Sequence, residues 1–170
     1  WQTRRALGNA PVAVNAYGAS GARIEQITDQ ISFAVARNAD IPGAAPYTLC
    51  VAHGGTNDIV QNRTLSQMQT DRLAQIAAIE AAGMLPILVT VPPYNAATAG
   101  QQTVMDQYNA WLKTLGYPLY DLYTDANNGS GDLKAVWDVG DGVHPTQGAN
   151  GGAAIMGQRL ADLIMLVGDR

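Results

Sequence analysis

The chain has 170 residues, of which 47% are hydrophobic and 14% are charged, a composition that is typical of one globular domain and excludes a disordered chain. A formal net charge of −4 and the lack of any Lys- or Arg-rich run argue against nucleic-acid binding. No apolar stretch of the sequence is long enough to span a membrane. The sequence begins at Trp1 without a Met, so we interpret it as a processed or excerpted piece.

In the first third of the chain, the sequence pattern predicts two strands with a helix between them, after the end of an earlier helix. Residues 1–8 resemble the end of a helix that stops at a glycine, and 12–15 form a short apolar strand. The segment 17–21 follows this strand as a turn with two glycines, which suits a close approach of the backbone. Apolar residues then recur at helical spacing and predict a helix whose apolar face is formed by Ile24, Ile27, Ile31 and Val35. A second apolar strand is predicted over 47–52.

The middle of the chain repeats this alternation. A long helix is predicted over 64–82, ended by Gly83, and a third strand over 85–91. We expect the residues of the long helix that face the sheet to be Leu73, Ile76 and Ile79. A strongly periodic helix follows, marked by Val104, Tyr108, Trp111, Leu112 and Leu115.

The last third supplies a fourth strand over 117–122 and a polar loop over 127–131. The next segment, 133–137, is a short helix or an ordered loop. A final helix has one apolar face, formed by Met156, Leu160, Leu163 and Ile164. No repeat or linker interrupts the sequence, so 1–170 is predicted to be a single domain.

Alternating strands and helices predict a parallel sheet with helices on both faces. In open sheets of this kind, ligands bind beyond the carboxyl ends of the strands. Three segments follow strands in this way, namely 17–21, 54–58 and 141–144, and we expect them to converge on one rim of the sheet.

The segment Asp141-Gly142-Val143-His144-Pro145 carries the strongest chemical signal. Histidine is the side chain whose ordinary pKa lies nearest to neutral pH, and a nearby carboxylate can fix its tautomer and stabilise its charged form. Asp141 and His144 therefore have the character of the base and orienting acid of a nucleophilic triad.

A second candidate group lies in Gly55-Thr56-Asn57-Asp58, directly after a predicted strand. The Asn57 amide and a backbone N–H at Gly21 can both donate to a developing oxyanion. Taken singly, Asn57 is also compatible with a helix cap and Gly21 with an ordinary turn. His53, the only other histidine, is interpreted as structural, and two histidines at this spacing make no convincing metal site.

These blocks resemble, in order and context, three sequence blocks of the SGNH, or GDSL-type, hydrolases. The resemblance covers nearly the whole chain and depends on 17–21, Gly55-Thr56-Asn57-Asp58 and Asp141-Gly142-Val143-His144-Pro145. It implies a flavodoxin-like three-layer α/β/α sandwich that cleaves acyl esters without metal or cofactor. It also implies a role for each block residue, namely His144 as general base, Asp141 as its orienting carboxylate, Gly21 and Asn57 as oxyanion donors, and Asp58 as support for Asn57.

One block of the family is missing from these residues. The sequence contains no Gly-Asp-Ser, the block that carries the nucleophilic serine at the end of the first strand. Ser20 lies beside Gly21 but lacks the strand–turn–helix setting of a nucleophile, and we expect no nucleophile among the 170 residues. In the flavodoxin-like order 2-1-3-4-5 the missing first strand is internal to the sheet. We therefore expect the strand and its serine to come from a segment upstream of Trp1, or from a companion chain, and the chain not to fold without it.

Three functions remain open on the sequence. The first is an ester hydrolase acting on acyl esters of carbohydrates or simple alcohols, and the second is a binding module of the same fold that has lost its nucleophile. The third, a nucleotide or flavin binder, lacks a phosphate-cradling loop. The expected partners are the acyl-ester substrate and the upstream segment, with no nucleic acid and no membrane span. The sequence fixes no compartment, although the resemblance favours an extracellular or secreted one.

Overall fold

A computed structural model describes residues 15–40 and 47–168 of the chain. The chain divides into two compact units. Of the described residues, the first comprises 15–16, 92–96 and 120–168, and the second comprises 17–40, 47–91 and 97–119. The single domain over 1–170 stays a prediction.

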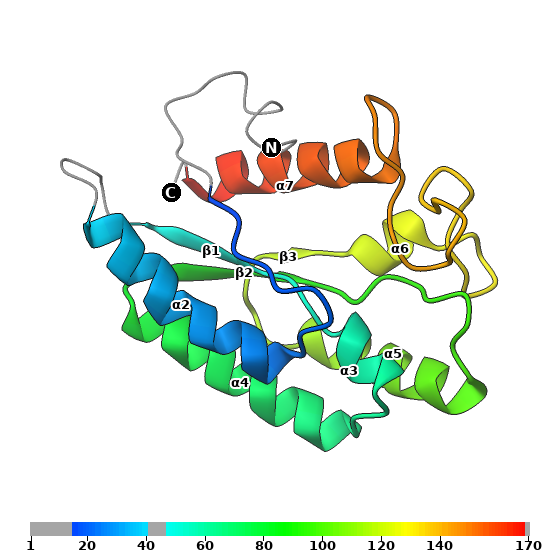
Figure 1. The fold of residues 1–170 in the computed structure, drawn as a ribbon, viewed down its shortest axis with the longest axis horizontal. Coiled ribbons are helices and arrows are strands. Elements are labelled where there is room, and N and C mark those ends of the chain that lie inside the picture. Colours follow the sequence, from blue (N-terminus) through cyan, green and yellow to red (C-terminus); the bar gives the residue numbers. More distant parts are fainter. Residues whose placement is uncertain (1–14, 41–46, 169–170) are drawn as a thin grey trace. The chain divides into compact units, whose positions relative to one another are not determined.

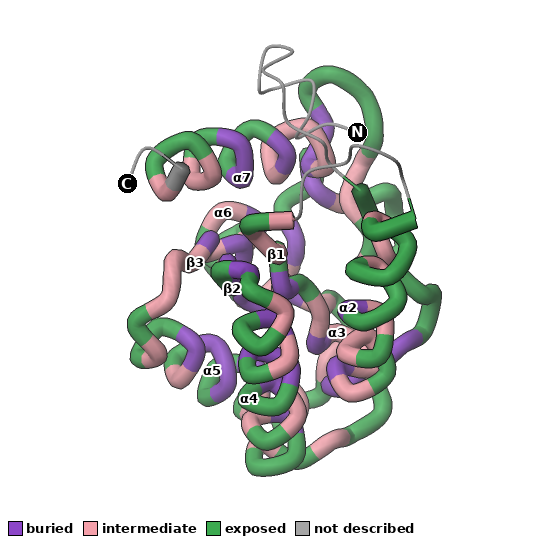
Figure 2. Tube along the Cα trace, turned by 90° about the vertical axis from the view of Figure 1, so that its left-hand side faces the viewer, coloured by how far each residue is buried: buried purple, intermediate pink, exposed green. Residues whose placement is uncertain are grey.

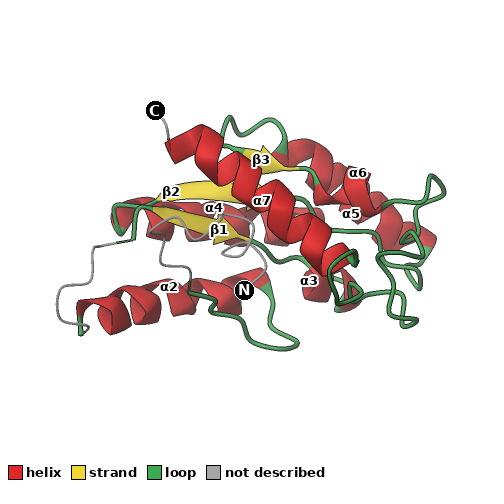
Figure 3. Ribbon diagram, turned by 90° about the horizontal axis from the view of Figure 1, so that it is seen from above, coloured by secondary structure: helices red, strands yellow, loops and turns green. Residues whose placement is uncertain are grey.

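The second unit contains two parallel strands and four helices. Its elements in chain order are α2 (Ile24–Ala39), β1 (Leu49–Ala52), α3 (Thr56–Val60), α4 (Leu65–Ala81), β2 (Leu85–Val89) and α5 (Ala99–Leu112). The strands β1 and β2 run side by side, with Leu49 opposite Leu85 and Ala52 opposite Leu88 (Figure 3). This arrangement confirms the α/β class and the parallel pairing that the alternation of elements predicted.

The first unit contains α6 (Leu122–Ala126), α7 (Gly152–Gly168) and the loops between them. The short strand β3 (Leu119–Tyr120) starts in the second unit, where it follows β2 in the sheet order β1-β2-β3. The segment 133–137 is an ordered loop rather than a helix, because Leu133 forms an antiparallel bridge with Asn127.

Helix α4 begins where the sequence predicts it, because a polar cap satisfies its first peptide groups. The Thr64 side chain accepts from the backbone N–H of Gln67, while the Gln67 side chain accepts from the backbone N–H of Thr64. Such reciprocal caps stabilise a helix start by about 1 kcal/mol. Helix α5 starts in the same way at Thr98 and Gln101.

The core of the second unit lies around β2 and the helices that pack against one another beside it. Four of the five residues of β2 are buried, as Figure 2 shows in purple. Helices α2 and α4 lie side by side (Figure 1). The largest buried apolar side chains of these elements are Ile24, Met68, Ile79, Ile87, Leu88 and Met105.

Two sequence predictions about the helix faces are wrong. Leu73 was expected to face the sheet, but 51% of its surface is exposed, while Ile76 and Ile79 are buried as expected. The neighbouring Arg72 is fully buried in its place, since its guanidinium finds polar partners inside the unit. Val35 of α2 is also exposed, at 37%.

The predicted helix over 1–8 and residues 12–14 of the first predicted strand lie outside the described residues. Within the described ranges, no helix has both the length and the apolar character that a membrane span requires.

Gly55, at the start of α3, generates a prediction about stability. Its φ of 124° is unfavourable for any other residue, and an added Cβ would lie 2.5 Å from Val91 Cγ2. Gly55→Ala should therefore lower the free energy of unfolding of the complete protein by about 2 kcal/mol or more, measured by urea denaturation. Gly100, in α5, has nothing within 4 Å of an added Cβ, so Gly100→Ala is the matched control. Equal stability of the two variants would contradict this account of Gly55.

Candidate active site

Asp141 and His144 meet in the first unit. His144 Nδ1 lies 2.7 Å from Asp141 Oδ2, so the contact expected from their spacing is present. The other carboxylate oxygen, Oδ1, accepts the backbone N–H groups of Val143 and His144, both at 2.9 Å. These bonds hold the backbone of Val143 and His144 against the carboxylate of Asp141, so that the His144 ring lies beside it.

The electrostatics of this pair favour a charged carboxylate. The backbone N–H of His144, the His144 ring and the backbone N–H of Val143 together lower the pKa of Asp141 to about 2. Asp141 is therefore ionised at neutral pH and accepts a hydrogen bond from Nδ1–H of His144. That bond selects the tautomer in which the lone pair of Nε2 is free to accept a proton.

Gly21 and Asn57 both lie in the second unit, where Asn57 contacts Ala22, the residue after Gly21. The Asn57 amide donates to the carbonyl of Ala22 at 3.0 Å, and the Gln61 amide donates to the carbonyl of Gly21 at 3.3 Å. Gly21 has a φ of 73°, which a glycine adopts without strain. An amide group has two N–H bonds, and the contact with Ala22 uses one of those on Asn57. Asn57 in α3 and Gln61, just after α3, therefore hydrogen-bond to the consecutive residues Ala22 and Gly21 before α2.

Asp58 links α3 to the beginning of α2. Its side chain is fully buried, and Oδ2 accepts the backbone N–H of Ile24 at 3.1 Å. Burial raises the pKa of this carboxyl, against the lowering effect of the bond from Ile24. Oδ1 has no hydrogen-bond partner among the described residues. These contacts are compatible with the predicted support of Asn57, which stays a prediction.

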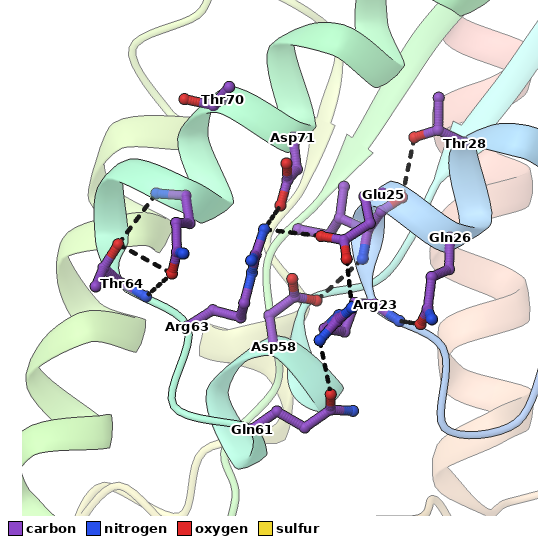
Figure 4. A network of polar contacts seen from close by, with 12 residues as sticks. Arg23, Glu25, Gln26, Thr28, Asp58, Gln61, Arg63, Thr64, Thr70 and Asp71 are labelled. Atoms are coloured by element: carbon purple, nitrogen blue, oxygen red, sulfur yellow. Dashed lines mark hydrogen bonds and ion pairs between the residues drawn. The ribbon is translucent and has the colours of Figure 1, made fainter.

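An ionic network surrounds Asp58 (Figure 4). The Arg63 guanidinium bridges Glu25 of α2, at 2.7 Å, and Asp71 of α4. Arg23 also pairs with Glu25 at 2.5 Å and donates to Gln61 at 3.2 Å. The network ties α2, α3 and α4 together around the turn that contains Gly21.

Arg72 is a buried residue of this region that sequence reasoning missed. It donates to the carbonyl oxygens of Ala52 and Gly54, at 3.0 and 2.9 Å, and to the Tyr108 hydroxyl at 2.9 Å. These bonds brace the chain between β1 and α3, just before Asn57. The only sequence signal was its position, four residues after Met68 on the inward face of α4.

His53 follows β1, and its backbone N–H donates to the carbonyl of Val51 at 3.2 Å. His53 is exposed among the described residues. In the part of the chain that the structure describes, no three His, Cys, Asp or Glu side chains gather as a metal site.

The serines occupy the positions that the sequence indicated. Ser32 donates to the carbonyl of Asp29, and the Ser130 hydroxyl donates to Asn128 Oδ1 at 2.8 Å. Ser66 lies in the first turn of α4, and Ser20 lies in the turn before α2. Within residues 15–40 and 47–168, no strand leads directly into a turn that contains one of these serines, the setting of a nucleophilic serine in α/β hydrolases.

The matches to known proteins agree with this description. Residues 1–150 match the model of the GDSL-like lipase/acylhydrolase family, and the chain belongs to that family. No curated protein matches the sequence.

Solved structures share the fold at low sequence identity. A GDSL-like lipase from Bacteroides thetaiotaomicron VPI-5482 is 21% identical with a TM-score of 0.68, over 89% of this chain and 75% of the other. AlinE4, an SGNH-hydrolase family esterase, is 15% identical with a TM-score of 0.59, over 98% of this chain and 78% of the other. The α/β fold predicted from the resemblance is therefore the fold of the SGNH hydrolases.

The environment of Asp141 predicts its titration. Its pKa of about 2 lies below the ordinary 3.8, so its bonds stabilise the loop fully above pH 4 and are lost as the pH falls toward 2. His144→Ala removes the ring contact but keeps the backbone N–H, which lowers this pKa most. We expect carbon NMR of the complete protein to show a midpoint near 2 that rises in the variant while staying below 3.8. A wild-type midpoint at the ordinary value would show that the loop does not hold the carboxylate.

Proposed function

We propose that the chain is the larger part of a serine ester hydrolase that removes acyl groups from carbohydrate or simple alcohol esters, with His144 as general base. The observation that carries this proposal is the 2.7 Å contact between His144 Nδ1 and Asp141 Oδ2. An oriented, partly exposed imidazole beside an ionised carboxylate is the arrangement that activates a hydroxyl nucleophile. Membership of the family supports hydrolysis of esters in general.

The proposed reaction has two stages. A serine hydroxyl gives its proton to His144 Nε2 while its oxygen bonds to the ester carbonyl carbon. The resulting oxyanion collapses, the bond to the alcohol breaks, and His144 returns the proton to the alcohol oxygen. Water then attacks the acyl-serine in the same way, releasing the carboxylic acid and returning the proton to the serine. Asp141 stays ionised throughout and stabilises the imidazolium.

Gly21 and Asn57 are the proposed donors to the oxyanion. The backbone N–H of Gly21 and the remaining N–H of the Asn57 amide lie on adjacent segments of the second unit. Donors fixed before the reaction stabilise developing charge without reorganisation. Asp58 holds the start of α2 to α3 through Ile24 and so supports both donors.

The nucleophilic serine is proposed to come from a segment outside the 170 residues, which also supplies a strand beside β1. Among the described residues, β1 pairs only with β2. Only Ala52 of β1 is buried, whereas Pro86–Val89 of β2 are all buried. An internal parallel strand is normally buried on both faces, so this exposure supports an additional strand at the β1 edge.

The lack of Gly-Asp-Ser in these residues favours one alternative, a binding module of the same fold without a nucleophile. Such a module would hold an acylated ligand without cleaving it. Labelling with a fluorophosphonate probe separates the two functions, because only an activated serine reacts.

The first test of the proposal uses the two histidines of the chain. In the complete protein, we expect a fluorophosphonate to label one serine of the upstream segment and p-nitrophenyl acetate to be hydrolysed. His144→Ala should abolish both reactions, because it removes the proposed general base. His53→Ala is the matched control and should retain both. Unlabelled wild-type protein would favour the binding module, and turnover that survives in His144→Ala would refute the triad.

The second test concerns the oxyanion donor. Asn57→Ala should lower kcat by roughly 10²–10³ with a smaller effect on KM, because the bond strengthens in the transition state. Asn57→Asp keeps the size of the side chain but cannot donate, so its kcat should fall as well. A change confined to KM, or full activity of Asn57→Asp, would mean that Asn57 binds the ground state or only caps the turn.

A further inference from the structure

Asn95 forms three hydrogen bonds to separate parts of the first unit. Its Oδ1 accepts the backbone N–H of Leu133 at 2.7 Å, and its Nδ2 donates to Asp138 Oδ2 at 3.0 Å. Its own backbone N–H donates to the carbonyl of Gly142 at 3.1 Å. Asn95 follows the Pro92-Pro93-Tyr94 segment after β2. It therefore joins that segment to Leu133 and to the loop 138–144.

Asp138 completes this arrangement. Its Oδ1 accepts the backbone N–H groups of Gly140 and Gly142, at 2.7 and 2.8 Å. These bonds lower the pKa of Asp138, so its carboxylate is ionised at neutral pH and its bond with the Asn95 amide is charge-assisted. The two side chains therefore act as one hydrogen-bonded pair across 43 residues of sequence.

The pair fixes the backbone at Gly142. The N–H of Gly142 is held by Asp138 and its carbonyl by the backbone of Asn95. Gly142 has a φ of 73°, and an added Cβ would lie 2.8 Å from Asn95 Cβ. Both the conformation and the position of this residue are thus determined by its two neighbours.

Gly142 connects Asp141 to Val143 and His144, so its conformation decides how the carboxylate and the ring meet. We propose that Asn95 and Asp138 are positioning residues that hold the Asp141–His144 pair in its catalytic geometry, an inference that rests on the proposed function. A misplacement of about 1 Å in a catalytic group can lower a rate by 10²-fold. The pair itself does not touch substrate.

Because the Asn95–Asp138 pair is partly exposed, its effect on positioning can be measured separately from its effect on stability. Asn95 is exposed and Asp138 is half-buried, so their hydrogen bond contributes little to the free energy of unfolding. Removing it should therefore change kcat far more than Tm. Removing a bond that does not position the Asp141–His144 pair would leave kcat unchanged.

An exchange of the two side chains tests the proposal. Asn95→Asp places two carboxylates together and Asp138→Asn places two amide groups together, so each single variant breaks the bond at constant size. In the double variant Asn95→Asp/Asp138→Asn the donor and acceptor are reversed, and all four side-chain bonds can form again. The matched control is Asn128→Ala, since Asn128 holds the backbone of Ser130 and Asp132 in another loop of the same unit.

We expect each single variant of the complete protein to lose about 10- to 100-fold in kcat with p-nitrophenyl acetate, while KM and Tm change little. The double variant should recover to within about threefold of wild type, and Asn128→Ala should be unaffected. Single variants with wild-type kcat, or a double variant as slow as the singles, would overturn the proposal.

A second readout does not depend on activity. Hydrogen exchange of the Gly142 amide, followed by NMR, should be slow in wild type, faster in both single variants and slow again in the double variant. If the wild-type protein hydrolyses no ester, the proposed function fails, while this exchange pattern still supports the positioning of the loop. Equal exchange in all four proteins would overturn the positioning even if the enzyme is active.

Discussion

Polar side chains satisfy many of the peptide groups in the loops on which the candidate site depends. Asp141 binds two backbone N–H groups, Asp138 binds two more, and Arg72 binds two carbonyls. A loop peptide without a partner is costly once it is removed from water. Each of these side chains therefore stabilises one loop conformation. That conformation determines where the candidate catalytic groups lie.

Each half of the proposed chemistry is assembled within one unit. The base and its carboxylate belong to the first unit, and both oxyanion donors belong to the second. Local hydrogen bonds alone are thus enough to preform each half before substrate binds. Such preorganisation is the property through which electrostatic stabilisation accelerates a reaction.

The sequence predicted the parts of this structure that depend on short-range pattern. Asp141 and His144 are three residues apart in a glycine-containing turn, so their contact follows from local geometry. The contact between Asn57 and Ala22, beside Gly21, needed the family resemblance, because 35 residues separate Asn57 from Ala22. Leu73 was misassigned and Arg72 was missed because apolar periodicity assumes that an arginine faces water, whereas a fully bonded guanidinium can be buried. The bond between Asn95 and Asp138 has no sequence pattern at all.

The hydrogen bonds of the loop 138–144 limit how its length can evolve. The Asp138 carboxylate accepts the backbone N–H groups of the second and fourth residues after it, and the Asp141 carboxylate accepts those of the second and third residues after it. An insertion or deletion between Asp138 and His144 would move these N–H groups out of reach, so this loop has a fixed number of residues. The loop at 127–132 has no such connection to Asp141 or His144 among the bonds described. Asn127 and Asn128 hold backbone N–H groups within that loop, but a change in its length would leave the bonds of Asp141 intact, so variation in length is easier to accommodate there than beside the histidine.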